Sequence, residues 1–158
     1  MVTKKEKQER SYQTALQPAF GLNAEYRIKR QIFFCYGHRL RDYTDPCKNL
    51  HGHNAKVEIE LATVRLDRRG MVVDLIDVGR TIKNWIDTTL DHKLLLRQDD
   101  PLIPTLKEHG EPYFVMEQNP TAEHIAQLIF EYASSQGLPV TSVTLWETDH
   151  AAAVYSNL

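Results

Sequence analysis

The chain has 158 residues, a length typical of one domain, with 42% hydrophobic and 25% charged residues, as in a globular protein with a buried core. Its net charge of −2 gives no reason to expect nucleic acid or a membrane as partner, and no apolar run approaches the roughly 18 residues of a membrane-spanning helix.

Two cysteines, Cys35 and Cys47, favour a reducing cytoplasm over a disulfide-stabilised secreted protein. The charged N-terminus lacks the apolar core of a secretory signal. We therefore interpret residues 1–25 as a solvated arm ahead of one domain, residues 26–158.

Two strands are expected in the first part of this domain. Residues 26–38 are rich in β-formers, which indicates a strand. Residues 39–50 are polar and turn-prone, which is typical of a loop. Apolar and polar residues then alternate from His53 to Leu61, which predicts a strand with one buried and one solvent-exposed face.

Helices are expected in the middle of the chain. Apolar residues recur at helical spacing over 78–90, with Asp77 as a plausible N-cap. Residues 98–119 contain three prolines and are expected to be mostly loop. A second helix should begin after Thr121, which can cap it, and end before Gly137.

Two short strands, over 141–148 and 151–155, are expected at the end of the chain. The order strand, strand, helix, helix, strand, strand predicts an α+β protein, with a four-stranded antiparallel sheet covered on one face by two helices. The other face of the sheet would be open to solvent or to another subunit.

Three histidines form a candidate metal site. His51 and His53 are two residues apart at the mouth of a strand, so both side chains point to one face. His38 ends the preceding strand and would lie beside them if the two strands are antiparallel neighbours. Three histidines are a typical ligand set for catalytic zinc, with the fourth position open. A single strand histidine is usually a packed or surface residue, so the spacing alone leaves both interpretations open.

The two cysteines are expected to differ in role. Cys47 could complete a zinc tetrahedron, which would make the site structural, or it could remain a free thiol that acts as a base beside a metal-bound substrate. Cys35 lies within an apolar strand segment, and we interpret it as an inert packing residue.

Two acidic positions are also candidates. Asp91 adjoins His92 and could orient its imidazole for acid–base catalysis, although a helix-terminal histidine beside a surface aspartate is the simpler alternative. Glu147 ends the apolar stripe of its strand. A buried carboxylate needs partners, and a guanidine-like ligand edge would suit it; the alternative is a frayed strand end in water.

Taken together, these features resemble the 6-pyruvoyltetrahydropterin synthase family of tunnelling-fold enzymes. Each motif is weak alone, and the ordered set is specific. The motifs are GHRL (37–40), CKNLHGH (47–53), GMVVD (70–74), LDH (90–92), PTAE (120–123) and WET (146–148).

The resemblance implies a role for each matching residue. It implies three zinc ligands: His38, His51 and His53. It implies that Cys47 is a catalytic base and that Asp91 and His92 form an acid–base relay. Glu147 would bind the 2-amino and ring N–H edge of the pterin and can join the relay, and Thr121 would also contact the pterin.

The gap inside the second motif separates subfamilies. Three residues lie between Cys47 and His51, as in the bacterial 6-carboxytetrahydropterin synthases of the queuosine pathway, whereas the biopterin-pathway enzymes carry a longer gap. The resemblance thus implies conversion of 7,8-dihydroneopterin triphosphate to 6-carboxytetrahydropterin, with release of acetaldehyde and triphosphate. The alternatives are 6-pyruvoyltetrahydropterin formation, or a non-catalytic zinc-stabilised binding module.

The resemblance also implies an assembly. Family members join their sheets around a ring and stack two rings, often as a hexamer, with active sites between subunits. A homo-oligomer of this kind would cover the bare sheet face, and would bury Glu147 without a partner in its own chain.

Overall fold

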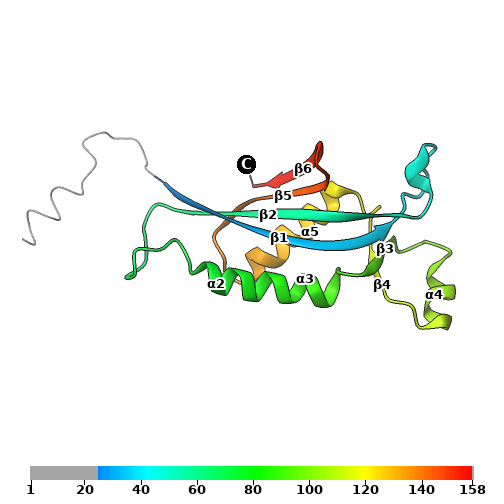
Figure 1. Cartoon of the computed structure of the whole chain (residues 1–158), viewed down its shortest axis with the longest axis horizontal. Helices are drawn as coiled ribbons and strands as arrows, with labels where there is room; N and C mark the ends of the chain where they lie inside the picture. The colour runs from blue at the N-terminus through cyan, green and yellow to red at the C-terminus, as the bar shows by residue number, and fades with distance from the viewer. Residues whose placement is uncertain (1–24, 158) are drawn as a thin grey trace, which may run out of the picture.

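Two long antiparallel strands form the centre of the fold in the computed structural model, which describes residues 25–157 (Figure 1). They are β1 (Tyr26–His38) and β2 (His51–Thr63), paired in register from one end to the other. The alternation predicted for the second strand is confirmed, because Ala55, Val57, Ile59 and Leu61 are buried and the residues between them are not. In β1 the same alternation holds from Ile32 to His38. The second strand begins at His51, two residues earlier than expected. The arm expected over residues 1–25 lies, except for its last residue, outside the described residues.

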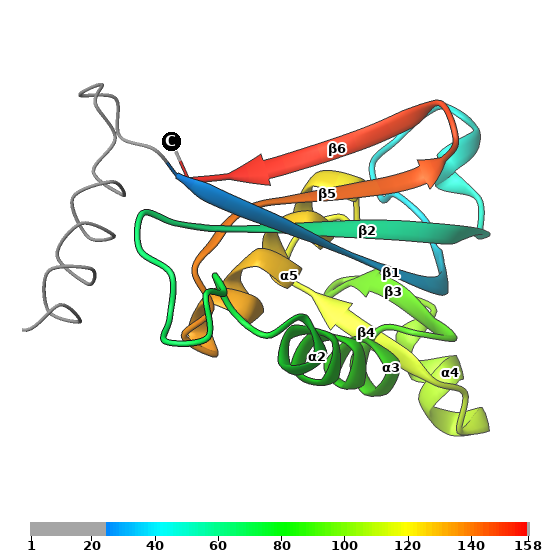
Figure 2. The same ribbon diagram turned by 60° about the vertical axis from the view of Figure 1, so that its left-hand side comes forward.

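The sheet has six strands, in the order β4-β3-β1-β2-β5-β6 (Figure 2). The additional members are β3 (Lys93–Arg97), β4 (Tyr113–Met116), β5 (Val140–Thr148) and β6 (Ala151–Ser156). The pairs β2–β5 and β5–β6 are antiparallel, whereas β1–β3 and β3–β4 are parallel. The prediction of a four-stranded antiparallel sheet is therefore wrong in strand number and in direction, and correct only for the β1-β2-β5-β6 part.

The missed elements lie in and before the proline-containing segment 98–119. β3 carries three successive leucines without alternation, a pattern that periodicity cannot distinguish from a helix end. The segment itself contains α4 (Ile103–His109) and then β4. Pro104 lies in the first turn of α4, where a proline has no helical hydrogen bond to lose, and Gly110 ends the helix at φ 70°. The prolines and glycine mark element boundaries here.

The first predicted helix is one continuous helical segment (Figure 1). It consists of α2 (Leu75–Val78), the π-helical η2 (Gly79–Lys83) and α3 (Asn84–Thr89). Its N-cap is Asp74, whose side chain accepts a 2.9 Å hydrogen bond from the Ile76 N–H. The expectation that Asp77 caps this helix is wrong, because Asp77 already lies in the first turn. The second helix, α5 (Ala122–Ser135), begins after Thr121 as predicted, and Thr121 Oγ1 accepts from the His124 N–H.

Both helical segments cover the same face of the sheet and share one core with it (Figures 1 and 2). Trp85 of α3 stacks on Tyr132 of α5, with ring centroids 4.2 Å apart. No helix in residues 25–157 is long and apolar enough to cross a membrane.

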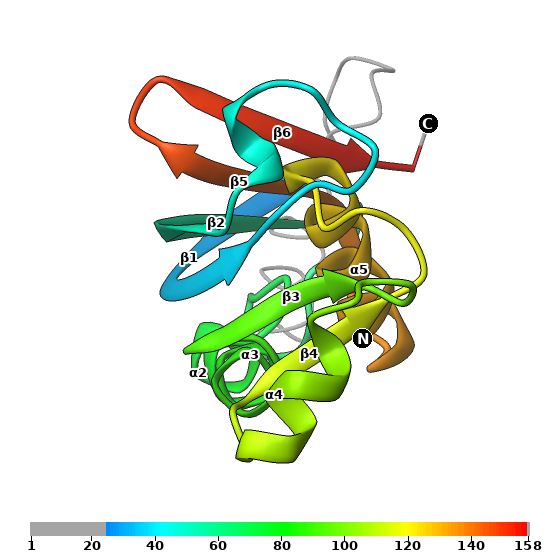
Figure 3. The same cartoon turned by 90° about the vertical axis from the view of Figure 1, so that its right-hand side faces the viewer.

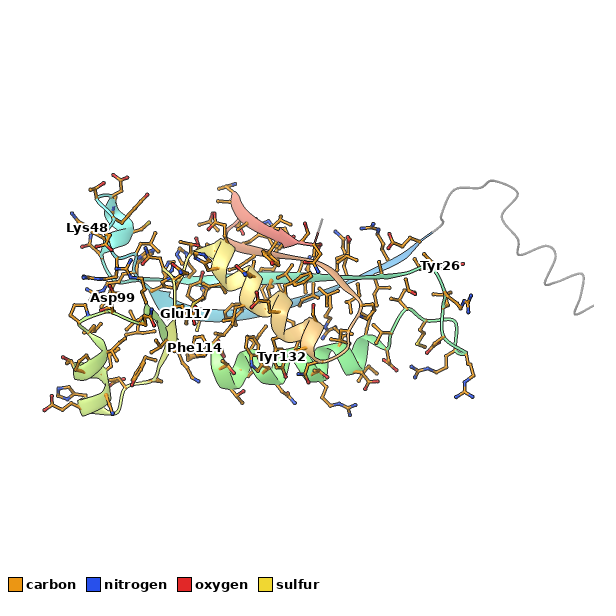
Figure 4. The ribbon with its side chains drawn as sticks, turned by 180° about the vertical axis from the view of Figure 1, so that it is seen from behind. Tyr26, Lys48, Asp99, Phe114, Glu117 and Tyr132 are labelled. Carbon is orange, nitrogen blue, oxygen red and sulfur yellow. The ribbon has the colours of Figure 1, made fainter. Side chains whose placement is uncertain are left out.

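One end of the molecule gathers the loop between β1 and β2 with the later elements. Figure 3 faces this end and shows the short 3-10 turn η1 (Pro46–Lys48) together with β3, β4 and α4. In Figure 4, Lys48 and Asp99 lie at this end and Tyr26 lies at the other. The candidate site residues at the end of β1 and the start of β2 are therefore at the end that carries these loops.

Candidate active site

The β1–β2 register brings the three predicted metal ligands together. His38 is the last residue of β1 and pairs with His51, the first residue of β2; His53 pairs with Tyr36. The backbones approach closely here, since a Cβ on Gly52 would lie 2.9 Å from the Tyr36 carbonyl oxygen. Glycine at position 52 is thus required by packing, and the two-residue period of the strand puts His51 and His53 on one face.

The three imidazoles converge through their Nε2 atoms. His38 Nε2 lies 3.0 Å from His51 Nε2 and 3.1 Å from His53 Nε2. His38 Nδ1 lies 2.7 Å from the Pro120 carbonyl oxygen, and His51 Nδ1 lies 2.8 Å from the Asn49 carbonyl oxygen. A carbonyl can only accept, so each of these Nδ1 atoms carries the proton and each Nε2 of a neutral ring is a lone-pair acceptor. Two such acceptors 3.0 Å apart repel each other unless a cation lies between them.

The protonation state of the cluster suits a metal. His38 is only 3% exposed, and its burial lowers its pKa below the ordinary value, with the neighbouring histidines acting in the same direction. A buried imidazole that stays neutral is the form that binds a metal ion. The donor set therefore fits a metal with three nitrogen ligands, and the carbonyl partners of Nδ1 fix the orientation of the rings.

The cluster opens into a cavity of about 370 Å³ that also contains other predicted site residues. Its lining includes Cys47, Thr121 and Glu147. Among the described residues, the ligand atoms lying within 4.8 Å of one another here are those of the three histidines, and the Cys47 sulfur is outside that group. Cys47 therefore lines the same cavity but is not part of the candidate metal-ligand group.

Glu147 lies beside the metal cluster and has a partner in its own chain. Its Oε1 accepts a 2.6 Å hydrogen bond from the Tyr36 hydroxyl and lies 3.7 Å from His38 Nε2. Burial, reinforced by this carboxylate, raises the pKa of Tyr36, so the hydroxyl remains a donor. The expectation that Glu147 lacks an intrachain partner is wrong. Tyr36 was missed, although its position two residues before His38 places it on the same strand face.

Asp91 and His92 lie apart from this cavity. They form the turn between α3 and β3, and His92 lines another cavity of about 570 Å³, to whose lining His53 also contributes. Asp91 Oδ2 lies 2.9 Å from His92 Nδ1, and Asp91 Oδ1 accepts a 2.8 Å hydrogen bond from the Cys35 N–H. The His92 side chain is 79% exposed. The chain thus forms the predicted aspartate–histidine pair but does not bring it to its own three-histidine cluster.

The loop that carries Cys47 is tied to the rest of the site at several points. The Leu40 N–H donates to the Cys47 carbonyl oxygen at 2.9 Å. The Asn119 side chain accepts from the Arg41 N–H at 2.8 Å and donates to the Arg41 carbonyl oxygen at 2.9 Å. Asn119 directly precedes Pro120, whose carbonyl oxygen binds the His38 ring. This segment therefore contacts both the cysteine loop and the His38 ring. In the sequence, only its place just before the predicted N-cap could have indicated this role.

A buried ion pair supports the start of the same loop. The Asp100 side chain is fully buried and accepts two hydrogen bonds from the Arg39 guanidinium, one of them at 2.8 Å from Nε. Asp100 also accepts from the Leu102 N–H at 2.9 Å. These bonds connect the first residue after β1 to the turn before α4.

Comparison with known proteins gives consistent results. The family model described as 6-pyruvoyl tetrahydropterin synthase matches residues 27–157. The 6-carboxy-5,6,7,8-tetrahydropterin synthase of Rickettsia conorii is 38% identical over 129 residues, which cover 77% of this chain and 94% of the relative. The enzyme of the same name from Aquifex aeolicus is 33% identical, with 89% of this chain and 96% of the relative covered.

Solved structures share the fold. A protein from Wolinella succinogenes, described as uncharacterized, superposes with a TM-score of 0.71 at 30% identity and covers 85% of this chain and 99% of its own. The Caenorhabditis elegans 6-pyruvoyl tetrahydropterin synthase gives a TM-score of 0.63 at 23% identity, with 85% and 97% covered. The chain therefore has the same overall fold as these solved structures.

Proposed function

The chain belongs to the 6-pyruvoyl tetrahydropterin synthase family, and we propose that it is a zinc-dependent 6-carboxy-5,6,7,8-tetrahydropterin synthase. It would convert 7,8-dihydroneopterin triphosphate to 6-carboxytetrahydropterin in the cytoplasm, as a step of queuosine synthesis, and release acetaldehyde and triphosphate. The observation that carries the proposal is the cavity in which three convergent imidazoles meet a cysteine outside the metal-ligand group. Relatives that carry this enzyme's name, and the three-residue gap between Cys47 and His51, favour the carboxy product.

The residues of the cavity divide the chemistry. Zinc bound by the three histidines would supply Lewis acidity toward the hydroxyls of the substrate side chain. Cys47 would remove a proton from that side chain, because its thiol faces the cavity and its loop is tethered to the site. The Tyr36 hydroxyl would orient Glu147 through Oε1, which leaves the other carboxylate oxygen to accept hydrogen bonds from the pterin edge. Thr121 would contact the pterin from the start of α5.

A second subunit would complete the site. Asp91 and His92 lie outside the cavity of their own chain and are accessible from solvent, so they could serve as the relay for the cavity of a neighbour. We therefore propose a homo-oligomer, a hexamer of two stacked rings, in which each active site combines residues of two chains. The sheet face that the helices leave bare would be covered in that assembly.

The first experiment separates an enzyme from a zinc-stabilised binding module. Cys47→Ala should keep zinc and oligomeric state but lose turnover, because the thiol would be a base and not a ligand. Zinc is measured by elemental analysis, assembly by light scattering and turnover with dihydroneopterin triphosphate. Cys35→Ala is the matched control and should keep all three properties. Loss of zinc and fold in Cys47→Ala would overturn the enzyme proposal.

The second experiment concerns the product. Mass spectrometry of the reaction with 7,8-dihydroneopterin triphosphate should find 6-carboxytetrahydropterin and acetaldehyde. Accumulation of 6-pyruvoyltetrahydropterin without the carboxy product would instead support the runner-up activity.

A further inference from the structure

A second group of metal-ligating atoms lies away from the three histidines. A cysteine sulfur, a carboxylate oxygen and an imidazole nitrogen, from Cys35, Asp91 and His92, lie within 4.8 Å of one another. The sequence suggested that Cys35 is an inert packing residue, but its thiol lies with this acid–base pair. Cys35 and His92 also line the same cavity of about 570 Å³.

Backbone hydrogen bonds hold this group in place. The Cys35 N–H donates to Asp91 Oδ1 at 2.8 Å, and the His92 N–H donates to the Cys35 carbonyl oxygen at 2.8 Å. These two bonds link β1 to the α3–β3 turn on both sides of the cysteine. Neither bond uses Asp91 Oδ2, the Cys35 thiol or the His92 imidazole, so these three groups are available to a ligand.

We propose that Cys35, Asp91 and His92 form a second binding site, for a thiophilic divalent cation such as Zn²⁺ or Cd²⁺, which inhibits the enzyme when filled. Thiolate, imidazole and carboxylate are the ligands of such cations, at about 2.0–2.3 Å for zinc. A tetrahedron of these bonds sets its ligand atoms roughly 3–4 Å apart, and the three atoms here all lie within 4.8 Å of one another. Asp91 Oδ2 and His92 Nδ1, at 2.9 Å, need to separate only slightly.

The charges of the site balance. Binding releases the proton of the Cys35 thiol to solvent, and the resulting thiolate and the Asp91 carboxylate neutralise the two positive charges of the cation. Asp91 is ready for this role: burial acts to raise its pKa, but the hydrogen bonds from the Cys35 N–H and from His92 outweigh burial and lower the pKa. The nearby Lys93 ammonium is bonded to the Thr88 carbonyl oxygen, which directs its charge to the end of α3. Water can fill the fourth position, since the His92 side chain is 79% exposed in the single chain and would face a neighbour's cavity in the proposed assembly.

The inhibitory consequence rests on the proposed function, in which Asp91 and His92 are the proton relay. A cation on His92 Nδ1 and the Asp91 carboxylate would remove both groups from proton transfer. The three-histidine cluster has His38 buried and the rings of His38 and His51 fixed by backbone carbonyl oxygens, so it should fill first. A first equivalent of zinc would thus support activity, and a second would abolish it.

Binding can be tested without any pterin chemistry. Cys47→Ala protein, with zinc already in the three-histidine cluster, is titrated with CdCl₂. Cys35 is then the sole thiol of the chain, so an ultraviolet thiolate-to-cadmium charge-transfer band should grow and saturate at about one equivalent per chain. In His92→Ala on the same background the band should appear only at about tenfold or more higher cadmium, because one ligand is gone. Absence of the band, or an unchanged titration in His92→Ala, would overturn the site.

Inhibition is tested in proteins that keep both Asp91 and His92. Wild-type enzyme should lose about tenfold or more of its activity in excess Zn²⁺ or Cd²⁺, whereas Cys35→Ser should keep its basal turnover and resist the same concentrations. Equal inhibition of both proteins would refute the inhibitory role. If the wild type does not turn over dihydroneopterin triphosphate at all, the proposed function fails, and the cadmium titration still decides the cation site.

Discussion

The three-histidine cluster and the Asp91–His92 pair are built in opposite ways. His38 and His51 face each other across two paired strands, and backbone carbonyl oxygens fix both rings. The pair lies on a turn where His92 adopts a left-handed backbone, φ 56°, and its side chain is largely exposed. The first region is complete within one chain, with its ligands on rigid strands. The second presents its groups outward, and His92 lines a different cavity from the one that Cys47, Thr121 and Glu147 line.

This difference shows what one chain can and cannot supply. Residues that must converge within about 0.5 Å are best placed on strands whose register fixes them. Groups that act from the opposite side of a substrate can instead be delivered by another subunit, provided that they remain exposed until assembly. The predictions below test this division between the two regions.

The largest effect is expected when the two regions are inactivated in different chains. Cys47→Ala and His92→Ala should each be nearly inactive as pure oligomers. In a ring assembled at random from equal amounts, about a quarter of the sites would combine an intact cysteine region with an intact relay. Activity should therefore rise to about a quarter of the wild-type value on co-assembly, as measured by turnover of co-purified, differently tagged chains.

A matched mixture gives the control. Cys47→Ala combined with Glu147→Gln should show no recovery, because both residues line the same cavity of one chain. If the Cys47→Ala and His92→Ala mixture stays as inactive as its parents, the relay acts within its own chain and the division is wrong.

The Arg39–Asp100 ion pair should dominate the stability of the first region. Asp100→Asn leaves the Arg39 guanidinium without its buried carboxylate, and we expect roughly 3 kcal/mol lower free energy of unfolding at pH 7, measured by urea denaturation. The exposed Asp99, which pairs with Arg97, is the control, and Asp99→Asn should have a much smaller effect. Similar losses for the two variants would contradict a special role for the buried pair.

The same variant should change the acid sensitivity of the protein. The hydrogen bonds from Arg39 lower the pKa of Asp100 below its ordinary value. A carboxylate with a lowered folded-state pKa adds stability above its unfolded pKa of about 4 and loses it as pH falls through the folded value. The difference between wild type and Asp100→Asn should thus shrink as pH falls below about 4. A constant difference would indicate that the ionisation of Asp100 is not its source.

Local pattern explains which parts of this molecule the sequence could predict. β1 follows from its β-forming residues, β2 from alternation, and the shared face of His51 and His53 from their two-residue spacing, all of which are local properties. The place of His38 beside them also required the two strands to pair in antiparallel fashion. β3 and β4 were missed because a leucine run and three prolines give no periodic signal, and their pairing beside β1 is a tertiary contact. The bond between Tyr36 and Glu147 joins strands separated by β2 in the sheet, so no local pattern could predict it.

The smallest effect is expected at Asn119, which joins the cysteine loop to the three-histidine cluster while its side chain bonds only the Arg41 backbone. Asn119→Ala removes both side-chain bonds to the Arg41 backbone and should let the loop that carries Cys47 shift. A displaced base slows the chemical step, so kcat should fall about tenfold, while zinc content and KM stay near the wild-type values. Gln118→Ala, at the exposed neighbouring position, should leave all three unchanged. Asn119→Asp keeps the acceptor for the Arg41 N–H, so its kcat should lie between those of Asn119→Ala and Gln118→Ala. If Asn119→Ala instead loses zinc or raises KM as much as it lowers kcat, the residue supports the whole site and does not position Cys47.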